Sequence, residues 1–469
     1  MKKAYDQNIR LSACVGIVDW LTFNVMLLIF YLSGLWFMQR YGNELIVDWL
    51  VFNISYLLAR SIVHISLHKR SSSYATIMGN TFGATVITIL SNAAILGMFH
   101  FTSPGFLRSL WMLLLIFVAL TIERVVLQSV IKHLRFRGHD NVDAVIVGDV
   151  AAAKDVIMFM SDRWNGYHLI GIFSDNTETR CEDGDTSIEV QRLGAIDDVE
   201  NWLENNDIDE IYICAKGKIT GTNNRMIRCC TNKCVHVYYI PAGDITINKN
   251  IKYKELGSTY VIALYNEPLM SASARLVKRI FDICFSGVVL LLIFPIMFII
   301  VAIVTKVTMP GPIFFRQKRT GYDGREFTCY KFRSMKVNDE ADETQATLDD
   351  ERITKWGHIL RHYNIDEFPQ FYNVFIGDMS IVGPRPHMLA HTEYYSKAIS
   401  EYMIRHYVRP GITGWAQTHG SRGETKTVDD MAVRVKKDIW YIEHWTFWLD
   451  IQIIIMTVGK LFNPDKKAY

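Results

Sequence analysis

Four apolar segments near the N-terminus constrain the fold of this chain more than any other feature. They run from Leu11 to Leu35, Leu45 to Ile65, Met78 to Met98 and Leu107 to Val126. Each is close to the roughly 20 residues that an α-helix needs to cross a bilayer. No small-residue cleavage site follows the first segment and further apolar segments come after it, which argues against a cleaved signal peptide. The sequence therefore predicts a four-helix transmembrane bundle over residues 1–138.

Charged residues around these segments predict the orientation of the chain. Cations precede the first segment and follow the second and fourth: Lys2, Lys3 and Arg10, then Lys69 and Arg70, then Lys132, Arg135 and Arg137. By the positive-inside rule, the N-terminus and everything beyond about residue 130 lie in the cytoplasm. Half of the residues are hydrophobic and 21% are charged, so apolar and soluble stretches are segregated. A net charge of only +2 argues against a nucleic-acid surface.

Residues 139–250 have the pattern of a Rossmann-like α/β domain. Short β-rich runs alternate with helical patterns such as Val199 to Glu204, and they lie at Asp143 to Val147, Tyr167 to Phe173, Ile208 to Cys214 and Val235 to Ile240. The first turn keeps only Gly148 of the glycines that a dinucleotide site needs. A bound nucleotide and a purely structural or regulatory module both stay open. The Asp207-Ile-Asp209 triplet lies at a strand entry and is discounted as a metal motif.

A fifth apolar run, Ile280 to Thr305, follows a predicted linker over residues 251–277. Cations flank it on both sides: Lys278 and Arg279 before it, and Lys306, Arg316, Lys318 and Arg319 after it. Both flanks therefore carry the cytoplasmic signature, and Pro295 near the middle is expected to break the helix. We predict a re-entrant helix over residues 278–310 that enters the membrane and returns. A spanning helix with a proline kink is the alternative.

The segment after this run contains the residues suited to phosphate chemistry. Glycines, aromatics and cations alternate from Gly311 to Met335, a composition suited to gripping phosphates and to lying on anionic headgroups. Asp366 and Glu367 follow shortly before Pro369, which fits the first turn of a helix. The positive end of a helix dipole favours an ionised carboxylate, and an ionised Asp is a competent nucleophile toward phosphorus while the adjacent Glu can hold Mg²⁺. An N-cap or an exposed turn is the plain alternative.

Residues from about 270 to 469 resemble the bacterial sugar transferase family, the polyprenyl-phosphate hexose-1-phosphate transferases. The resemblance rests on a series of ordered motifs: Lys278-Arg-Ile-Phe-Asp282, Gly311-Pro-Ile-Phe-Phe315, Tyr330-Lys-Phe-Arg-Ser-Met335, Asp366-Glu-Phe-Pro-Gln370, Gly377-Asp-Met-Ser380, Gly383-Pro-Arg-Pro386 and Arg409-Pro-Gly-Ile-Thr-Gly-Trp415. The plan of four spans, a degenerate nucleotide-binding-like domain and this segment resembles the large members. The tail from Gly420 is most similar to undecaprenyl-phosphate glucose phosphotransferases of exopolysaccharide pathways.

The resemblance implies a role for individual residues of a mainly helical catalytic domain over residues 311–469. Asp366 matches the nucleophile and Glu367 its partner associated with Mg²⁺. Pro295 matches the helix-breaking proline, with Phe294 standing where many members have serine. Lys331, Arg361 and Arg385 match cations near the active site, and Arg333 and Arg319 are predicted to bind substrate with them.

The implied reaction transfers hexose-1-phosphate from a UDP-sugar to undecaprenyl phosphate with release of UMP. A covalent phosphosugar-aspartyl intermediate, a bacterial inner-membrane location and a cytoplasmic catalytic domain come with it, as the first membrane step of exopolysaccharide or capsule assembly. Glucose rests on the tail alone, so a galactose-1-phosphate transferase of the same family stays open. The alternatives outside the family are a metal-dependent glycosyltransferase and a membrane-anchored regulatory scaffold. A homodimer is also left open.

Overall fold

The computed structural model describes residues 2–33, 43–63, 70, 73–98, 106–139, 141–177, 179–183, 186–215, 221–241, 252–257, 259–336, 352–421, 423, 425 and 427–462. Lys69, which was used above for orientation, and the last residues of the tail lie outside these ranges. The chain divides into two compact units. One comprises Met1–Val142, Lys154–Leu169 and Glu255–Thr259, and the other comprises Asp143–Ala153, Ile170–Lys254 and Tyr260–Tyr469.

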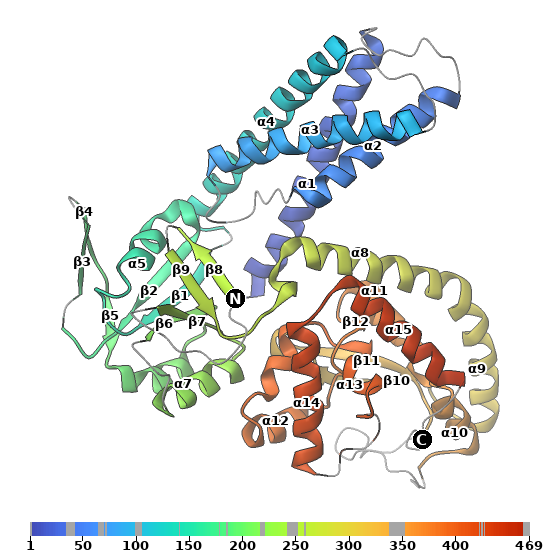
Figure 1. The fold of residues 1–469 in the computed structure, drawn as a ribbon. Helices are drawn as coiled ribbons and strands as arrows, with labels where there is room; N and C mark the ends of the chain where they lie inside the picture. The colour runs from blue at the N-terminus through green and yellow to red at the C-terminus, as the bar shows by residue number, and fades with distance from the viewer. Residues whose placement is uncertain are drawn as a thin grey trace. The chain divides into compact units, whose positions relative to one another are not determined.

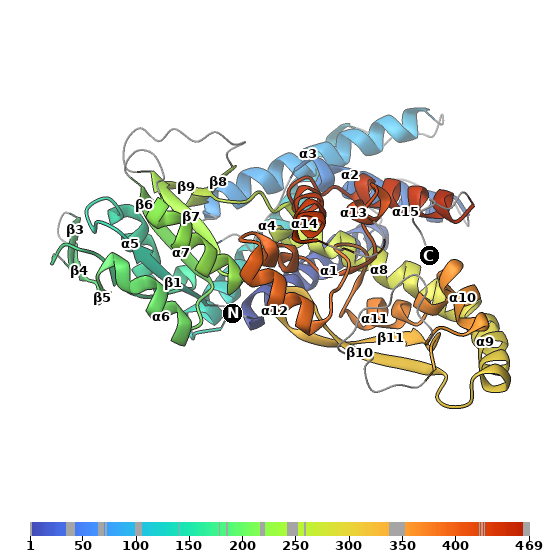
Figure 2. The same cartoon turned by 90° about the horizontal axis from the view of Figure 1, so that it is seen from below.

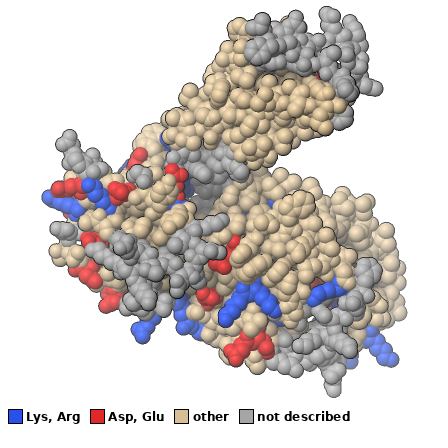
Figure 3. Space-filling view, viewed as in Figure 1, with Lys and Arg blue, Asp and Glu red and all other residues tan. Residues whose placement is uncertain are grey.

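The first unit is built on the four predicted N-terminal helices, α1 (Lys2–Leu32), α2 (Asn43–Ile62), α3 (Tyr74–Met98) and α4 (Phe106–Phe136) (Figure 1). Three of them contain stretches long and apolar enough to cross a membrane, namely Cys14–Leu32, Tyr74–Met98 and Leu110–Phe136. The helix α2 carries Asp48 and Arg60 among its apolar residues. Large apolar side chains such as Leu32, Leu90 and Ile122 point outward, and the face of the bundle in Figure 3 is almost without charge. Such a surface fits lipid, and the chain is a multi-pass membrane protein.

A buried polar network joins all four helices of the bundle. Asp19 on α1 forms an ion pair with Arg124 on α4 at 2.7 Å between Oδ1 and Nε. The Tyr56 hydroxyl of α2 donates to Asp19, and Arg124 donates to the Thr81 hydroxyl of α3. Because each partner comes from a different helix and none is exposed, the network fixes which faces of the helices meet.

The α/β domain contains a seven-stranded sheet in the order β5-β2-β1-β6-β7-β9-β8. The strands are β1 (Val142–Val147), β2 (Tyr167–Phe173), β5 (Arg192–Gly194), β6 (Glu210–Ala215), β7 (His236–Pro241), β8 (Lys252–Leu256) and β9 (Thr259–Ala263), with a separate hairpin of β3 (Arg180–Asp183) and β4 (Thr186–Glu189). The pairs β1–β6 and β6–β7 are parallel, which confirms the predicted Rossmann-like fold. The β-strands β8 and β9 occupy part of the predicted linker, so that segment belongs to the sheet.

Helices cover this sheet in the manner expected for alternating strands and helices. The domain contains α5 (Lys154–Ser161), α6 (Val199–Asn205) and α7 (Gly221–Asn232). Both α6 and α7 contribute to one apolar core with the inward side chains of the strands, through residues such as Leu203 and Cys230 (Figure 2).

The predicted phosphate-binding turn has a packing explanation. Gly148 has φ +129°, and a Cβ there would lie 2.6 Å from the Cβ of Cys214 on β6. A glycine is therefore required by the neighbouring strand. Alanines occupy positions 151–153, where a pyrophosphate would need close approach to the backbone. The described part of this turn does not fit a bound dinucleotide.

The C-terminal region begins with a long bent helix and a β-hairpin. The helix consists of α8 (Ala272–Val288), a π-helical turn η4 (Val289–Ile293) and α9 (Phe294–Thr308), and the hairpin pairs β10 (Phe314–Thr320) with β11 (Glu326–Phe332). The remaining elements are α10 (Lys355–His362), the 3₁₀ turn η6 (Ile365–Glu367), α11 (Gln370–Ile376), β12 (Ser380–Val382), α12 (Leu389–Ala398), the 3₁₀ segment η7 (Tyr402–Tyr407), β13 (Gly411–Thr413), α13 (Trp415–Thr418), α14 (Val428–Glu443) and α15 (Phe447–Phe462). The prediction of a mainly helical domain is confirmed.

Pro295 lies in the first turn of α9, directly after the π-helical turn. Ile293 and Phe294 keep right-handed helical angles, and the chain absorbs the missing proline N–H through the π-helical turn and a bend (Figure 1). Ser273–Thr308 is long and apolar enough to cross a membrane. Lys278 near its start and the chain after α9 are nonetheless bonded to the same domain. Arg333 donates to the carbonyls of Met309 and Pro310 directly after α9. A helix with both ends on one domain supports the re-entrant path, which stays a prediction.

The start of this long helix is anchored by a buried ion pair. Lys278 Nζ lies 2.6 Å from Asp450 Oδ2 on α15 and also donates to the carbonyl of Val382 on β12. The Tyr441 hydroxyl and the Trp445 indole donate to the same carboxylate. One turn later, Asp282 accepts from Ser380 and from the N–H of Ile381. The Lys-Arg-Ile-Phe-Asp motif therefore attaches α8 to the strand that precedes residue 383.

Replacement of Lys278 is expected to destabilise this domain strongly. Lys278→Met leaves Asp450 charged and buried, and breaking such a pair costs about 3–5 kcal/mol. The matched control is Lys318→Met, because Lys318 pairs with Glu326 at 3.0 Å on an exposed hairpin where both side chains are more than half exposed. That change is expected to cost about 0–1 kcal/mol. Thermal unfolding of the detergent-solubilised variants measures both, and equal shifts would contradict the anchoring role.

Candidate active site

The two adjacent carboxylates lie on a short turn whose neighbouring residues pack into an apolar core. Asn364 follows α10, directly precedes η6 and adopts a left-handed conformation at φ 55°. The 3₁₀ turn η6 then presents Asp366 and Glu367 immediately before α11, as predicted from Pro369. Ile365 and Phe368 on either side pack into the core around Phe332 and Leu360. With only 7% of its surface exposed, Asp366 is not an ordinary surface cap.

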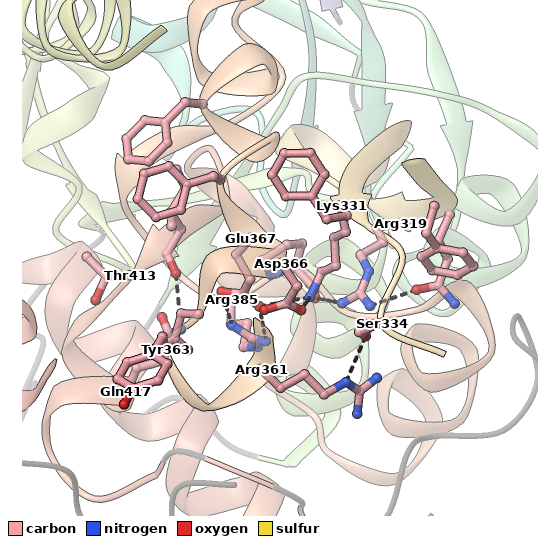
Figure 4. A pocket seen from close by; sticks show the side chains of 18 of the residues that line it. Arg319, Lys331, Ser334, Arg361, Tyr363, Asp366, Glu367, Arg385, Thr413 and Gln417 are labelled. Carbon is pink, nitrogen blue, oxygen red and sulfur yellow. Dashed lines mark hydrogen bonds and ion pairs between the residues drawn. The ribbon is translucent and has the colours of Figure 1, made fainter. Parts of the chain in front are cut away.

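Two cations converge on the carboxylate pair (Figure 4). Lys331 Nζ on β11 lies 2.8 Å from Glu367 Oε1 and 4.0 Å from Asp366 Oδ2. Arg385, from the segment after β12, donates through Nη2 to Glu367 Oε1 at 2.7 Å and through Nη1 to Oε2 at 3.4 Å. Both cations therefore pair mainly with Glu367, while Asp366 lines the cavity with Lys331 nearby.

The surroundings separate the pKa values of the two acids. Burial raises the pKa of Asp366 to about 6, against the opposing effect of Lys331. Burial also acts to raise the pKa of Glu367, but Arg385 and then Lys331 outweigh it and hold that pKa well below its usual range. The sequence predicted that a helix dipole keeps Asp366 ionised. In the structure, the pKa of Asp366 is instead set by burial, which raises it, and by Lys331, which lowers it. Two neighbouring acids with different pKa values can take different chemical roles.

The pair faces a cavity of about 1060 Å³ with two kinds of wall. Apolar side chains of α8, η4, α11 and α15 form one part: Phe285, Val289, Ile293, Phe371, Ile454 and Val458. Cations form the other part: Arg316, Arg319, Lys331, Arg333, Lys336, Arg352, Arg361, Arg385, Arg434 and Lys460. Such a cavity suits a ligand with an anionic head and a long apolar tail.

All the predicted site residues except Pro295 line this cavity, but the hydrogen-bond partners of their side chains differ. Arg361 donates through Nε to Ser334 and lies at the cavity (Figure 4). Arg319 instead donates to the Pro386 carbonyl and to Gln317. Arg333 donates to the backbone after α9. These two guanidinium groups therefore support the site through the backbone.

Several cavity residues were missed by sequence reasoning. His387, His391, Thr413 and Gln417 line the cavity. The signal for them was weak, since His387 and His391 follow the Gly-Pro-Arg-Pro motif at a spacing that a surface helix also shows. Their proximity to Asp366 depends on the path of the chain between β12 and β13.

The carboxylates fit a magnesium ion of the kind that is shared with substrate. No group of three or more metal-binding side chains occurs among the residues that the structure describes. Mg²⁺ bound with substrate phosphates usually takes only one or two protein carboxylates. Glu367 would be such a carboxylate, since its Oε2 contacts Arg385 at the longer distance of 3.4 Å, which leaves room for a further ligand.

Comparison with known proteins identifies the family. The chain is 39% identical over 341 residues to the UDP-glucose:undecaprenyl-phosphate glucose-1-phosphate transferase of Escherichia coli (strain K12), covering 72% of this chain and 71% of that protein. The chain belongs to the bacterial sugar transferase family. The family model described as bacterial sugar transferase matches residues 273–464, which include the long bent helix and both carboxylates.

Other relatives of this bacterial sugar transferase carry the same or a related name. The chain is 34% identical over 401 residues to the UDP-glucose:undecaprenyl-phosphate glucose-1-phosphate transferase of Xanthomonas campestris pv. campestris, covering 85% of this chain and 82% of that protein. It is 36% identical over 247 residues to the UDP-N-acetylgalactosamine-undecaprenyl-phosphate N-acetylgalactosaminephosphotransferase of Aeromonas hydrophila, covering 52% of this chain and 56% of that protein. A second model, described as a CoA-binding domain, matches residues 63–241.

Proposed function

We propose that this transferase moves glucose-1-phosphate from UDP-glucose to undecaprenyl phosphate and releases UMP. The observation that carries the proposal is Asp366, a buried carboxylate beside Lys331 in a cavity with a cationic and an apolar wall. The two relatives with the greatest matched length named above carry the glucose name, which favours glucose over galactose or an N-acetylated sugar. Membership of the family favours a bacterial inner-membrane location, and the orienting cations favour a catalytic domain in the cytoplasm.

The first step is the attack of Asp366 on the donor. A carboxylate oxygen forms a bond to the β-phosphorus of UDP-glucose, and the bond from this phosphorus to the bridging oxygen breaks. The electron pair leaves with that oxygen, so UMP departs and phosphoglucose stays on Asp366. Lys331 and Arg385 lie where they can offset the charge on the diphosphate, and Arg361 adds a further cation at the cavity.

The second step transfers the phosphosugar to lipid. A phosphate oxygen of undecaprenyl phosphate attacks the same phosphorus, and the bond to the Asp366 oxygen breaks, which regenerates the carboxylate. The apolar wall formed by side chains such as Val289 and Val458 suits the isoprenoid next to the phosphate. One Mg²⁺, held by Glu367 and the donor phosphates, would neutralise diphosphate charge. Little free energy changes between two diphosphate linkages, so positioning and charge neutralisation are the main requirements.

The test is product analysis with the full-length protein in nanodiscs. The protein is incubated with Mg²⁺, undecaprenyl phosphate and, separately, UDP-glucose, UDP-galactose and UDP-N-acetylgalactosamine. The proposal is supported if UMP is released with UDP-glucose and with neither of the other two UDP-sugars. UDP as the nucleotide product would indicate a metal-dependent glycosyltransferase, and no nucleotide release with any sugar would favour the regulatory scaffold.

The pH dependence of the reaction is expected to follow Asp366. Its nucleophilic form is the ionised one, and its pKa is about 6, so kcat/KM falls as the pH drops through about 6. The decrease approaches about tenfold per pH unit below that value. Glu367, whose pKa is held well below its usual range, stays ionised across this window. Initial rates of UMP release between pH 5 and 8 measure the profile, and a flat profile would contradict the assignment.

Removal of Mg²⁺ is expected to abolish activity reversibly. EDTA should stop UMP release and added MgCl₂ should restore it, since the diphosphate charge is then neutralised again. Glu367→Gln is expected to raise the Mg²⁺ concentration that gives half-maximal rate by about tenfold or more, because a carboxylate ligand is lost. Glu393→Gln serves as the matched control, because Glu393 is exposed and its carboxylate pairs with Lys397 on α12. Equal Mg²⁺ requirements in both variants would exclude Glu367 as the ligand.

A further inference from the structure

The loop that carries Arg385 is held almost entirely through its carbonyl groups. Pro384 and Pro386 flank Arg385 and have no N–H to donate. Four consecutive carbonyls, from Pro384 to His387, each accept a hydrogen bond from a residue that is distant in the sequence. The donors are, in order, the N–H of Gly411 at 2.9 Å, Arg405 Nη2 at 2.8 Å, Arg319 Nη1 at 2.7 Å and the N–H of Thr320 at 3.2 Å.

Arg405, on η7, donates to the carbonyl of Arg385, whose side chain contacts Glu367. Its side chain is almost completely buried, and the atom that donates to the Arg385 carbonyl also lies 2.8 Å from Asp438 Oδ2 on α14. Nη1 lies against the ring of His387, 2.9 Å from Nε2. The guanidinium is also 5.4 Å from the centre of the Tyr402 ring. Arg405 is therefore fixed on several sides while it holds one carbonyl.

A lysine could not reproduce this arrangement. The planar guanidinium presents several N–H groups in a fixed fork, whereas an ammonium is a single point on a flexible stem. Arg405 contacts a carbonyl and a carboxylate through Nη2 and an imidazole through Nη1. Only the fork can make all three without moving the loop.

We propose that Arg405, oriented by Asp438, is a positioning residue that sets the place of the Arg385 side chain through the Arg385 carbonyl. Arg385 in turn forms the two-point contact with Glu367 next to the nucleophile Asp366. Arg405 does not line the cavity, so its effect on the reaction passes through Arg385. This inference rests on the proposed function, because the measured quantity is UMP release.

The experiment is a double-mutant cycle between positions 405 and 385 with the full-length protein in nanodiscs. Arg405→Lys keeps the positive charge opposite Asp438 and loses the fork. It is expected to lower kcat between about ten- and a hundredfold in the unmodified background, since small misplacements of charged groups have effects of this size. In an Arg385→Ala background the same change is expected to alter kcat less than about twofold, because the group that it positions is absent.

A purely structural role gives a different result. It would lower kcat by the same factor in both backgrounds, and that outcome would overturn the proposal. Glu210→Gln, which disrupts the buried pair with Lys254 in the α/β domain, is the control for loss of stability, with unfolding temperature measured for every variant. If Arg405→Lys does not fold, Asp438→Asn replaces it in the same cycle. Absence of UMP release by the unmodified protein would instead contradict the proposed function.

Discussion

Asp366→Asn is expected to abolish UMP release, with a decrease of roughly 10⁴-fold or more, as observed when nucleophiles are removed from other enzymes. The amide is nearly the same size as the carboxylate but cannot form the bond to phosphorus. The change also removes a buried negative charge 4.0 Å from Lys331, so the fold is not expected to be destabilised. UMP is quantified after incubation with UDP-glucose and undecaprenyl phosphate, alongside the unfolding temperature.

The intermediate offers a second readout for this variant. Without undecaprenyl phosphate, the unmodified protein is expected to gain the mass of one phosphohexose, and Asp366→Asn is expected to gain none. Glu393→Gln, an exposed acid-to-amide change on α12, is the matched control. It should retain both UMP release and formation of the intermediate. An active Asp366→Asn protein would return the carboxylate to the role of an ordinary turn residue.

Arg385→Ala is expected to lower kcat by about 10²- to 10³-fold, the range for loss of one charge-stabilising donor at a reacting group. Glu367 would retain Lys331 at 2.8 Å and lose both contacts from Arg385. Without that neutralising charge, the pKa of Glu367 should rise toward its ordinary range, and more negative charge would face the donor diphosphate. Steady-state kinetics with UDP-glucose give kcat and KM separately.

The conservative variant distinguishes charge from geometry at this position. Arg385→Lys keeps a cation but cannot contact both oxygens of Glu367, so an intermediate loss of kcat is expected. Arg192→Ala, which removes an arginine that donates to the Ser174 carbonyl in the α/β domain, is the matched control. A full retention of kcat in Arg385→Ala would exclude Arg385 from the reaction.

The fold was predictable where local patterns dominate. The four β-rich runs became β1, β2, β6 and β7 because alternating strands and helices specify a parallel sheet. The strands β8 and β9 were missed because short runs next to polar residues, such as Lys252 to Leu256, do not stand out from a linker. The π-helical turn beside Pro295 was not predicted, because no local sequence rule reports it.

The site was predictable to the extent that its residues are adjacent in sequence. Asp366 and Glu367 follow one another, and the cations near them lie in recognisable motifs. Whether an arginine faces ligand or backbone depends on contacts across the fold, so the carbonyl contacts of Arg319 and Arg333 were not foreseen. The partners of Arg405 are equally remote, since its contacts to Arg385 and Asp438 span 20 and 33 residues. The different pKa values of the two acids likewise arise from burial in three dimensions.

The attachment of both ends of the α8–α9 helix to one domain has a consequence for how the protein responds to its lipid surroundings. Lys278 ties one end to the strand before the Arg385 loop, and Arg333, two residues from Lys331, ties the other. We predict that the apolar helix between these two ends enters the membrane, where a mismatch with the bilayer thickness costs free energy. We therefore expect a thinner or thicker membrane to strain the contacts of Lys278 and Arg333, so that the turnover rate depends on acyl-chain length.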